Sequence, residues 1–178
     1  MQPLEIPQYL LDSGLARNGM IAVTQPRRVA ATSLASRVAL ETQSNLGNLV
    51  GYSVRFSDCS SEKTKIKFVT DGMLMRELLG DPELERYSVV VVDEAHERTL
   101  RTDVVLARLK EILKRRNSSQ TDVKGKGKGK EREGRAPKNP LKVVIMSATL
   151  DAEKFSSFFG KYVIKFNPKL RFTNLTMA

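Results

Sequence analysis

The chain has 178 residues, of which 40% are hydrophobic and 28% are charged, and its formal net charge is +10. This length suits one soluble domain with a buried core, and no apolar run approaches the roughly 18 residues that would cross a membrane. A single cysteine, Cys59, excludes an internal disulfide and a cysteine zinc site, and it suits a reducing compartment. The positive charge favours a polyanion such as nucleic acid, although a basic composition alone is a weak signal.

The predicted strands are short runs of apolar, largely β-branched residues without polar alternation. Such runs favour a parallel sheet that helices cover on both faces. Four of them follow one another along the chain, at residues 20–25, 65–70, 87–93 and 141–149.

Helical patterns lie between these strands. Pro26 suits the first turn of a helix on which Ala30, Leu34 and Val38 recur at four-residue spacing. A second helix has one apolar face, formed by Val105, Leu109 and Ile112. The alternation of strands and helices predicts an α/β fold with a doubly wound, mostly parallel sheet and right-handed crossovers.

Residues 117–139 interrupt this alternation. They contain seven Lys or Arg and three Asp or Glu, with repeated Lys-Gly pairs that offer no apolar face. We therefore predict a disordered basic surface insertion, with a nuclear-import or RNA-tethering tract as the alternative. The string GKGKGK is no phosphate-binding loop, because that loop follows a strand and has the spacing G-x-x-x-x-G-K-[ST].

Polar residues gather where the predicted strands end. Ligands of open parallel sheets bind beside the carboxyl ends of the strands, so these residues are predicted to share one ligand-binding edge. They are Thr24, Gln25, Thr70, Asp71, Asp93, Glu94, Ser147 and Thr149.

Asp93 and Glu94 follow four consecutive valines. At the tip of a buried strand an aspartate can hold Mg²⁺, and a neighbouring glutamate can orient or deprotonate a water. Nucleotide hydrolysis needs both tasks. The alternative for two acids at this place is a cap on the following helix.

Five short motifs, taken in order, resemble the first RecA-like domain of the DEAH-box RNA helicases, which has the P-loop NTPase fold. The resemblance covers roughly residues 5–160. The motifs are TQPRRVAA (24–31), VGYSVRF (50–56), TDGML (70–74), DEAH (93–96) and SAT (147–149).

The resemblance implies an ATP-binding and catalytic site. Asp93 would hold Mg²⁺, Glu94 would position the attacking water, and His96 would link the nucleotide site to the nucleic-acid side. Arg37 would stack on the adenine of ATP. From the residues alone, His96 could equally be structural and Arg37 could be a solvated helix-face arginine.

The resemblance also implies an RNA site. Arg27 and Arg28 would face the RNA backbone at a helix start, with Thr70 and Gly72 beside them. Ser147 and Thr149 would couple hydrolysis to domain movement, and simple helix capping is the alternative for both.

The chain departs from the family pattern at both ends. Alignment to the family helix that ends in PQ[YF]L places Gln2 where the phosphate-loop lysine belongs and Pro3 where the metal-binding Thr belongs. We therefore expect an incomplete domain at residues 1–160, without its first strand and phosphate loop. Residues 161–178 resemble no part of the second RecA-like domain and are interpreted as a divergent tail.

Two functional hypotheses follow from the resemblance. The chain is a fragment of an ATP-dependent RNA helicase that is inactive alone, or it is a catalytically dead RNA- or partner-binding module. Expected cofactors are ATP and Mg²⁺, and expected partners are single-stranded RNA, the missing second domain and an activating protein. The nearest family members act in ribosome biogenesis and splicing, which favours the nucleus or nucleolus over the cytoplasm.

Overall fold

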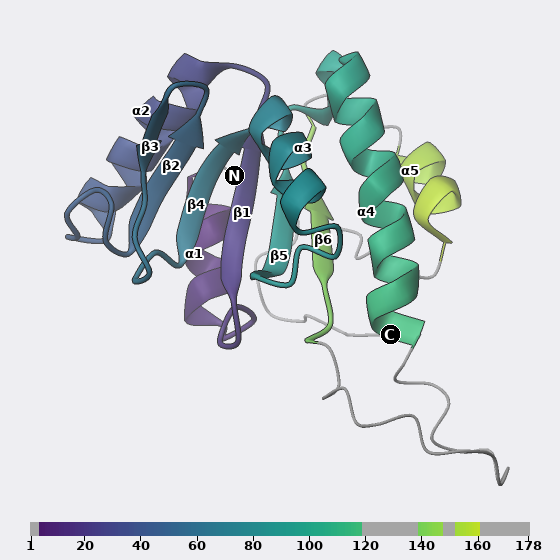
Figure 1. Cartoon of the computed structure of the whole chain (residues 1–178), viewed down its shortest axis with the longest axis horizontal. Coiled ribbons are helices and arrows are strands. Elements are labelled where there is room, and N and C mark those ends of the chain that lie inside the picture. The colour runs from purple at the N-terminus through teal and green to yellow at the C-terminus, as the bar shows by residue number, and fades with distance from the viewer. Residues whose placement is uncertain (1–3, 119–138, 148–151, 161–178) are drawn as a thin grey trace, which may run out of the picture.

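The computed structural model describes residues 4–118, 139–147 and 152–160. Within these residues the chain forms one six-stranded sheet with helices on both faces (Figure 1). The strand order is β3-β2-β4-β1-β5-β6, and every neighbouring pair is parallel except β2 and β3. The predicted α/β class with a mostly parallel sheet is confirmed. None of the helices in these ranges is long and apolar enough to span a membrane.

All four predicted strands are present and parallel. Their observed bounds are β1 Met20–Gln25, β4 Ile66–Thr70, β5 Tyr87–Val92 and β6 Lys142–Ile145. Side chains alternate between the two faces, so that Ile21 and Val23 lie in one core cluster while Ala22 lies in the other. The pattern of continuous apolar runs therefore predicted the strands correctly, because both faces are buried. β6 ends before Ser147, so its predicted extension to residue 149 was wrong at Met146 and Ser147, and residues 148 and 149 lie outside the described ranges.

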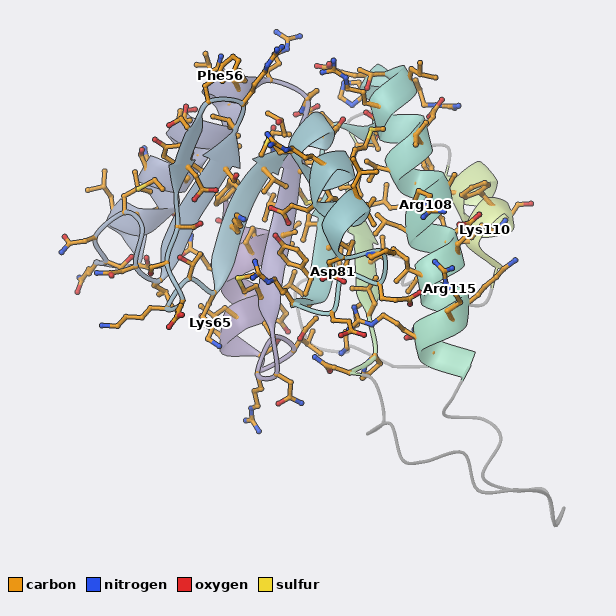
Figure 2. All side chains as sticks on the ribbon, viewed as in Figure 1. Phe56, Lys65, Asp81, Arg108, Lys110 and Arg115 are labelled. Atoms are coloured by element: carbon orange, nitrogen blue, oxygen red, sulfur yellow. The ribbon has the colours of Figure 1, made fainter. Side chains whose placement is uncertain are left out.

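The hairpin formed by β2 (Val50–Val54) and β3 (Ser57–Cys59) was not predicted as strands. A Cβ on Gly51 would lie 2.4 Å from the carbonyl oxygen of Cys59, so only glycine fits where the chain of β3 approaches β2 this closely. Phe56 occupies the turn with a φ of 68° and is exposed at the carboxyl end of the sheet (Figure 2). Glycine and serine weaken the apolar pattern of β2, which explains why its sequence gave little strand signal.

The helices pack in two layers. α1 (Glu5–Asp12) and α2 (Arg28–Glu41) bury apolar residues against one face of the sheet. α3 (Asp71–Gly80), α4 (Leu100–Ser118) and α5 (Ala152–Phe159) bury theirs against the other face (Figure 1). Coverage of both faces confirms the predicted doubly wound arrangement.

The predicted apolar face of α4 is confirmed, and that of α2 is confirmed in part, since Val38 is fully buried and Leu34 packs against the core. Val105, Leu109 and Ile112 are fully buried. On α2 the buried residues are Ala31, Ala35, Val38 and Ala39, while Ala30 and Leu34 are only half-buried and Pro26 precedes the helix. Small alanines let the helix approach the sheet closely, so size rather than hydrophobicity determines which face turns inward.

Arg116 closes the amino ends of the strands. Its buried guanidinium donates five hydrogen bonds to four backbone carbonyls, those of Glu83, Leu84, Tyr87 and Asn139. Asn117 beside it pairs with both backbone groups of Leu141 at 3.1 Å. These contacts connect the end of α4 to the start of β6.

Three residues of the predicted insertion at 117–139 belong to the described structure, two at its start and one at its end. Asn117 and Ser118 belong to α4. The amide of Asn139 donates to the hydroxyl of Ser88 at 2.7 Å. Residues 119–138 lie outside the described ranges, as do Gln2, Pro3, Thr149 and the predicted tail.

Candidate functional site at the carboxyl edge of the sheet

The carboxyl edge of the sheet brings the predicted motif residues together. In the parallel register Gln25 pairs with Thr70 and Thr24 with Val92, so the next residue, Asp93, also lies at this edge. The amide of Met146 donates to the carbonyl of Val92 at 2.8 Å, which places the end of β6 alongside. The prediction that Thr24, Thr70, Asp93 and Ser147 share one edge is therefore confirmed. Ser147 is half-buried just after β6.

Asp93 is buried at 5% exposure and is fixed through both carboxylate oxygens. One accepts a hydrogen bond from the side-chain amide of Gln25 at 2.6 Å, and the other accepts from the backbone amide of Glu94 at 2.8 Å. Burial raises the pKa of Asp93, although both hydrogen bonds oppose that rise. A desolvated carboxylate of this kind gains from a nearby cation. Gln25 is thus a site residue to which the sequence assigned no role.

The surroundings of Asp93 suit Mg²⁺ better than a metal ion whose ligands are all protein side chains. Among the described residues no group of three or more His, Cys, Asp or Glu could bind a metal by itself. Mg²⁺ usually binds through one or two carboxylates, with waters and substrate phosphates supplying the other ligands. One buried, oriented carboxylate fits that requirement.

Glu94 starts a strained turn. Its φ is 52°, it precedes the 3-10 helix η1 (Ala95–Glu97), and its side chain is 39% exposed. The imidazole Nδ1 of His96 lies 3.3 Å from the Glu94 carboxylate. Glu94 makes no side-chain capping bond. The helix that follows, α4, is capped instead by Thr99, whose hydroxyl accepts from the amide of Thr102 at 3.1 Å, so the capping alternative is not supported for Glu94.

The four predicted RNA-binding residues lie where α2 and α3 begin. Arg27 is the N-cap of α2 and Thr70 that of α3, and neither side chain caps its helix, which leaves first-turn amides for an anion. Arg28 is exposed, and Gly72 is half-buried. An Nη of Arg101 lies 3.5 Å from where a Cβ on Gly72 would stand. Arg101 adds positive charge that the sequence motifs did not single out.

Several buried polar atoms mark the same edge. Asp71 accepts a hydrogen bond from Thr102 at 2.6 Å, and Thr102 is bonded to Thr99 at 2.7 Å. The second carboxylate oxygen of Asp71 and the hydroxyl of Thr24 are buried without a partner among the described residues. Buried polar atoms are normally satisfied, so these two indicate a place where water or ligand enters.

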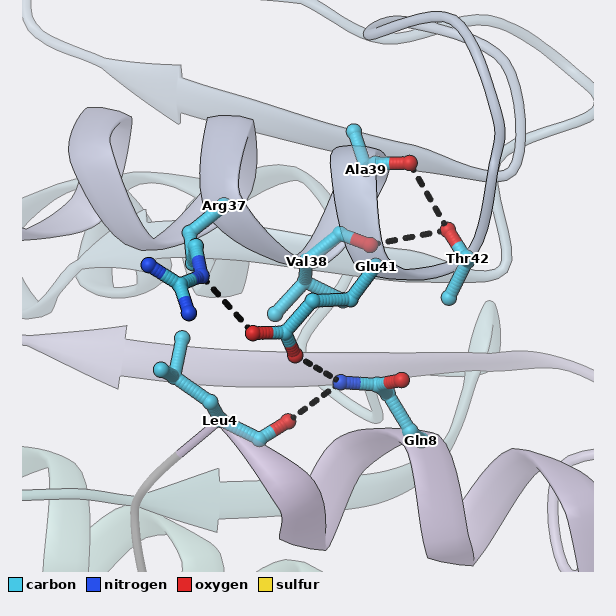
Figure 3. Close-up of polar contacts among 7 residues, drawn as sticks. All are labelled: Leu4, Gln8, Arg37, Val38, Ala39, Glu41 and Thr42. Carbon is cyan, nitrogen blue, oxygen red and sulfur yellow. Dashed lines mark hydrogen bonds and ion pairs between the residues drawn. The ribbon is translucent and has the colours of Figure 1, made fainter.

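Arg37 lies apart from this cluster. It is nine residues along α2 from Arg28, about 14 Å by helical rise. Its Nε donates to Glu41 at 2.7 Å, and Glu41 also accepts from Gln8 of α1 at 2.8 Å (Figure 3). The hydrogen bond from Arg37, followed by that from Gln8, lowers the pKa of Glu41. The structure therefore places Arg37 beside α1, in an ion pair that leaves its side chain 65% exposed.

Comparison with known proteins agrees with the order of the motifs. The chain is 51% identical over 157 residues to the ATP-dependent RNA helicase DHX33 of Mus musculus, covering 88% of this chain and 20% of that protein. It is 47% identical over 156 residues to the probable ATP-dependent RNA helicase DHX40 of Homo sapiens, covering 88% and 18% respectively. No protein-family model matches the chain.

A plant protein extends the same comparison. The pre-mRNA-splicing factor ATP-dependent RNA helicase DEAH10 of Arabidopsis thaliana is 46% identical over 176 residues, covering 88% of this chain and 24% of that protein. The chain thus spans about a fifth of the length of the curated relatives it matches.

Proposed function

Because the chain is homologous, over most of its length, to one segment of the DEAH-box ATP-dependent RNA helicases, we propose that it supplies part of an ATP- and RNA-binding domain. In this proposal it is the first RecA-like domain, and the carboxyl edge of its sheet carries both ligands. The observation that carries the proposal is the buried Asp93 carboxylate, fixed by Gln25 and by the backbone beside the partly exposed Glu94.

Asp93 and Glu94 are proposed to serve nucleotide hydrolysis. Bound Mg²⁺ would neutralise phosphate charge, and the Asp93 carboxylate is the residue that would hold it. Glu94 lies next to it with a partly exposed carboxylate, so it can orient a water and accept its proton. His96 contacts Glu94 and is proposed to restrict the rotation of that carboxylate.

Arg37 is proposed to contact the adenine of ATP. Its guanidinium already forms an ion pair with Glu41 through its edge. A planar guanidinium can donate through its edge and still present its face to a purine, so the ion pair is compatible with stacking. Ser147 and Thr149 are proposed to couple the nucleotide site to domain movement.

Arg27 and Arg28 are proposed to bind the RNA backbone, with Thr70 and Gly72 at the start of the neighbouring helix. The support is the exposure of both arginines at the start of α2, and the absence of a side-chain cap on α2 and on α3. Such contacts are with phosphate, so we expect weak binding to single-stranded RNA without sequence preference. A role in RNA processing is proposed because the plant relative is named a pre-mRNA-splicing factor. A part in ribosome biogenesis and a nuclear or nucleolar location are proposed from the motif resemblance alone.

The RNA contact is tested by changing Arg27 and Arg28 together to alanine. Each lost phosphate contact should lower the slope of log K against log salt by about 0.7, and affinity for unrelated sequences should fall equally. Changing Arg108 and Arg115 of α4, which pair with Glu111 and Glu83 and lie away from this edge (Figure 2), removes the same charge and should have a smaller effect. Intact binding in the first variant, together with loss of binding on deleting residues 120–136, would refute the arginine contact.

This chain by itself is proposed not to hydrolyse ATP. Its 178 residues contain no G-x-x-x-x-G-K-[ST] phosphate-binding motif. Loss of even one preorganised donor in a catalytic site costs about 10²–10³ in rate, and this motif supplies several. Phosphate release with Mg²⁺, ATP and single-stranded RNA should therefore equal that of the Glu94→Gln variant, and a clearly higher rate would contradict the proposal.

A second candidate function is an RNA- or partner-binding module without catalysis. The net charge of +10 and the exposed arginines favour it over an isolated enzyme. RNA binding that is independent of ATP would support this candidate. Tighter RNA binding on addition of ATP and Mg²⁺ would support the helicase domain instead. Sequencing the 5′ end of the transcript decides whether an upstream phosphate loop is encoded.

A further inference from the structure

Glu97 connects an arginine of the proposed RNA site to the turn that carries Asp93 and Glu94. A guanidinium nitrogen of Arg27 lies 3.2 Å from the Glu97 carboxylate. The Arg27 side chain is 77% exposed, whereas that of Glu97 is 29% exposed. The residues belong to different elements, since Arg27 precedes α2 and Glu97 ends the 3-10 helix η1.

This turn is strained at both ends. Glu94 has a φ of 52° and Arg98 a φ of 47°, both in the left-handed region that non-glycine residues seldom adopt. Such conformations persist only where surrounding contacts determine them. Those contacts include three that reach outside the turn: Ala95 donates to Met146 at 3.1 Å, Arg98 pairs with Asp103 at 2.8 Å, and Glu97 pairs with Arg27.

The two neighbouring arginines differ in what they contact. Within the described part of the chain, Arg28 has no ion-pair partner, while Arg27 is paired with Glu97. A guanidinium binds a carboxylate and a phosphate through the same N–H donors. An RNA phosphate that takes the N–H donor facing Glu97 must displace that carboxylate, and two anions at one guanidinium also repel each other.

We propose that Glu97 is an internal substitute for an RNA phosphate: it holds Arg27 in the absence of RNA, and a bound phosphate displaces it and loosens the turn from Glu94 to Arg98. The inference rests on the proposed RNA contact of Arg27. Glu97 is then a positioning residue, because it acts on Glu94 through the backbone of the turn. RNA binding thereby changes the conformational freedom of the carboxylate proposed to orient water.

Affinity measurements test the competition. Binding of a labelled oligouridylate at low salt is compared for wild type, Glu97→Gln and Glu111→Gln, each also in an Arg27→Ala background. Glu111 is a matched control, since it pairs with Arg108 on α4. We expect Glu97→Gln to tighten binding about threefold, as suits an exposed ion pair, and Glu111→Gln to have less effect. With Arg27→Ala, the gain from Glu97→Gln should fall to the level of the control.

Hydrogen exchange tests the effect on the turn. The amides of Ala95 and Glu97 donate to Met146 and Glu94, and their exchange reports whether the turn is fixed. RNA should accelerate their exchange in wild type. In Glu97→Gln the exchange should already be fast and RNA should change it little. A charge that merely repels RNA would leave this exchange unchanged.

Each unfavourable outcome has a distinct meaning. Equal affinities for Glu97→Gln and Glu111→Gln, or a gain that persists undiminished with Arg27→Ala, would overturn the competition while leaving the RNA contact in place. If RNA leaves the exchange rates of the Ala95 and Glu97 amides unchanged, the proposed effect on the turn is overturned. Absence of oligouridylate binding, or binding indifferent to Arg27→Ala alone, would refute the proposed RNA contact and this inference with it.

Discussion

Arg27 and Arg116 lie at opposite ends of the parallel strands and differ in what surrounds their guanidinium groups. Arg116, at the amino ends, is buried, and its five N–H donors all reach backbone carbonyls. Arg27, at the carboxyl ends, is exposed and has one ion pair with Glu97. At the amino end the guanidinium donors are thus all used in a hydrogen-bond network, and the carboxyl end is left with donors available for a ligand.

The same contrast holds for the other groups at the two ends. The carboxyl edge has strained residues at Glu94 and Arg98, together with unpartnered buried atoms at Thr24 and Asp71. At the amino edge the polar side chains around Arg116 are bonded. Stability concentrated at one edge allows the other to keep unsatisfied and strained groups, as ligand-binding sites do.

The largest expected effect is that of Arg116→Ala. Four backbone carbonyls, two of them in buried contacts and two in partly buried ones, lose their donor, so we expect a loss of about 3–5 kcal/mol in the free energy of unfolding. Urea unfolding followed by circular dichroism measures it. Arg108→Ala on the same helix breaks only an exposed pair with Glu111 and should cost less than about 1 kcal/mol. Equal losses in both variants would show that the amino edge has no special part in stability.

Two glycine substitutions compare the edges directly. A Cβ on Gly19, before β1, would lie 2.6 Å from the Ser88 hydroxyl and 2.9 Å from the Arg86 carbonyl, so Gly19→Ala should cost about 1–3 kcal/mol. A Cβ on Gly72 would meet only the flexible Arg101 side chain, at 3.5 Å. Gly72→Ala should leave thermal stability unchanged or slightly raised, since alanine favours helix, while RNA binding weakens. A stability loss at Gly72 as large as at Gly19 would contradict this comparison.

The pH dependence of stability should differ in sign between two carboxyls. The raised pKa of Asp93 means that the folded state binds its proton more tightly, so this group's contribution to stability declines as pH rises through that pKa. Asp93→Asn should therefore gain about 1 kcal/mol or less relative to wild type between about pH 4 and pH 7. Urea unfolding at both pH values measures the gain.

Glu41 provides the opposite case. Its pKa is lowered by Arg37 and Gln8, so its contribution is present at neutral pH and is lost as pH falls through the folded pKa. Glu41→Gln should lose stability relative to wild type over the interval in which Asp93→Asn gains. Parallel changes in the two variants would contradict the assigned directions.

The smallest expected loss of stability is that of deleting residues 120–136. Arg116 and Asn117 fix the flanking residues at the amino edge, and the entropy of closing a loop depends only weakly on its length. A shorter loop costs less entropy to close, so the free energy of unfolding should not fall. A large fall in melting temperature would show that the deleted segment contributes to the fold.

The sequence predicted the sheet better than it predicted the helix packing. Runs such as that from Val89 to Val92 are apolar throughout because both faces of the sheet are covered. This local pattern can be recognised in the sequence without knowledge of the fold. The hairpin at 50–59 was missed, since its close crossing at Gly51 is a property of two strands together. The buried face of α2 was displaced by one residue, because the distance between helix and sheet selected alanines over Leu34.

The sequence also located the candidate site but not its internal contacts. Strand-end motifs placed Asp93, Thr70 and Arg27 at one edge, because parallel strands all end there. The partners Gln25 and Glu97 come from other segments of the chain, and only the folded backbone brings them within 2.6 Å of Asp93 and 3.2 Å of Arg27.

By itself the sequence determined the order of the strands along the chain, the α/β class and the edge that carries the polar motifs. Only the tertiary structure decided what each arginine does. Arg115 and Arg116 are adjacent in sequence, yet one is half-exposed beside Glu83 and the other is fully buried. Successive residues of a helix point about 100° apart, so the side chain that enters the core depends on where the sheet lies, and no local pattern records that position.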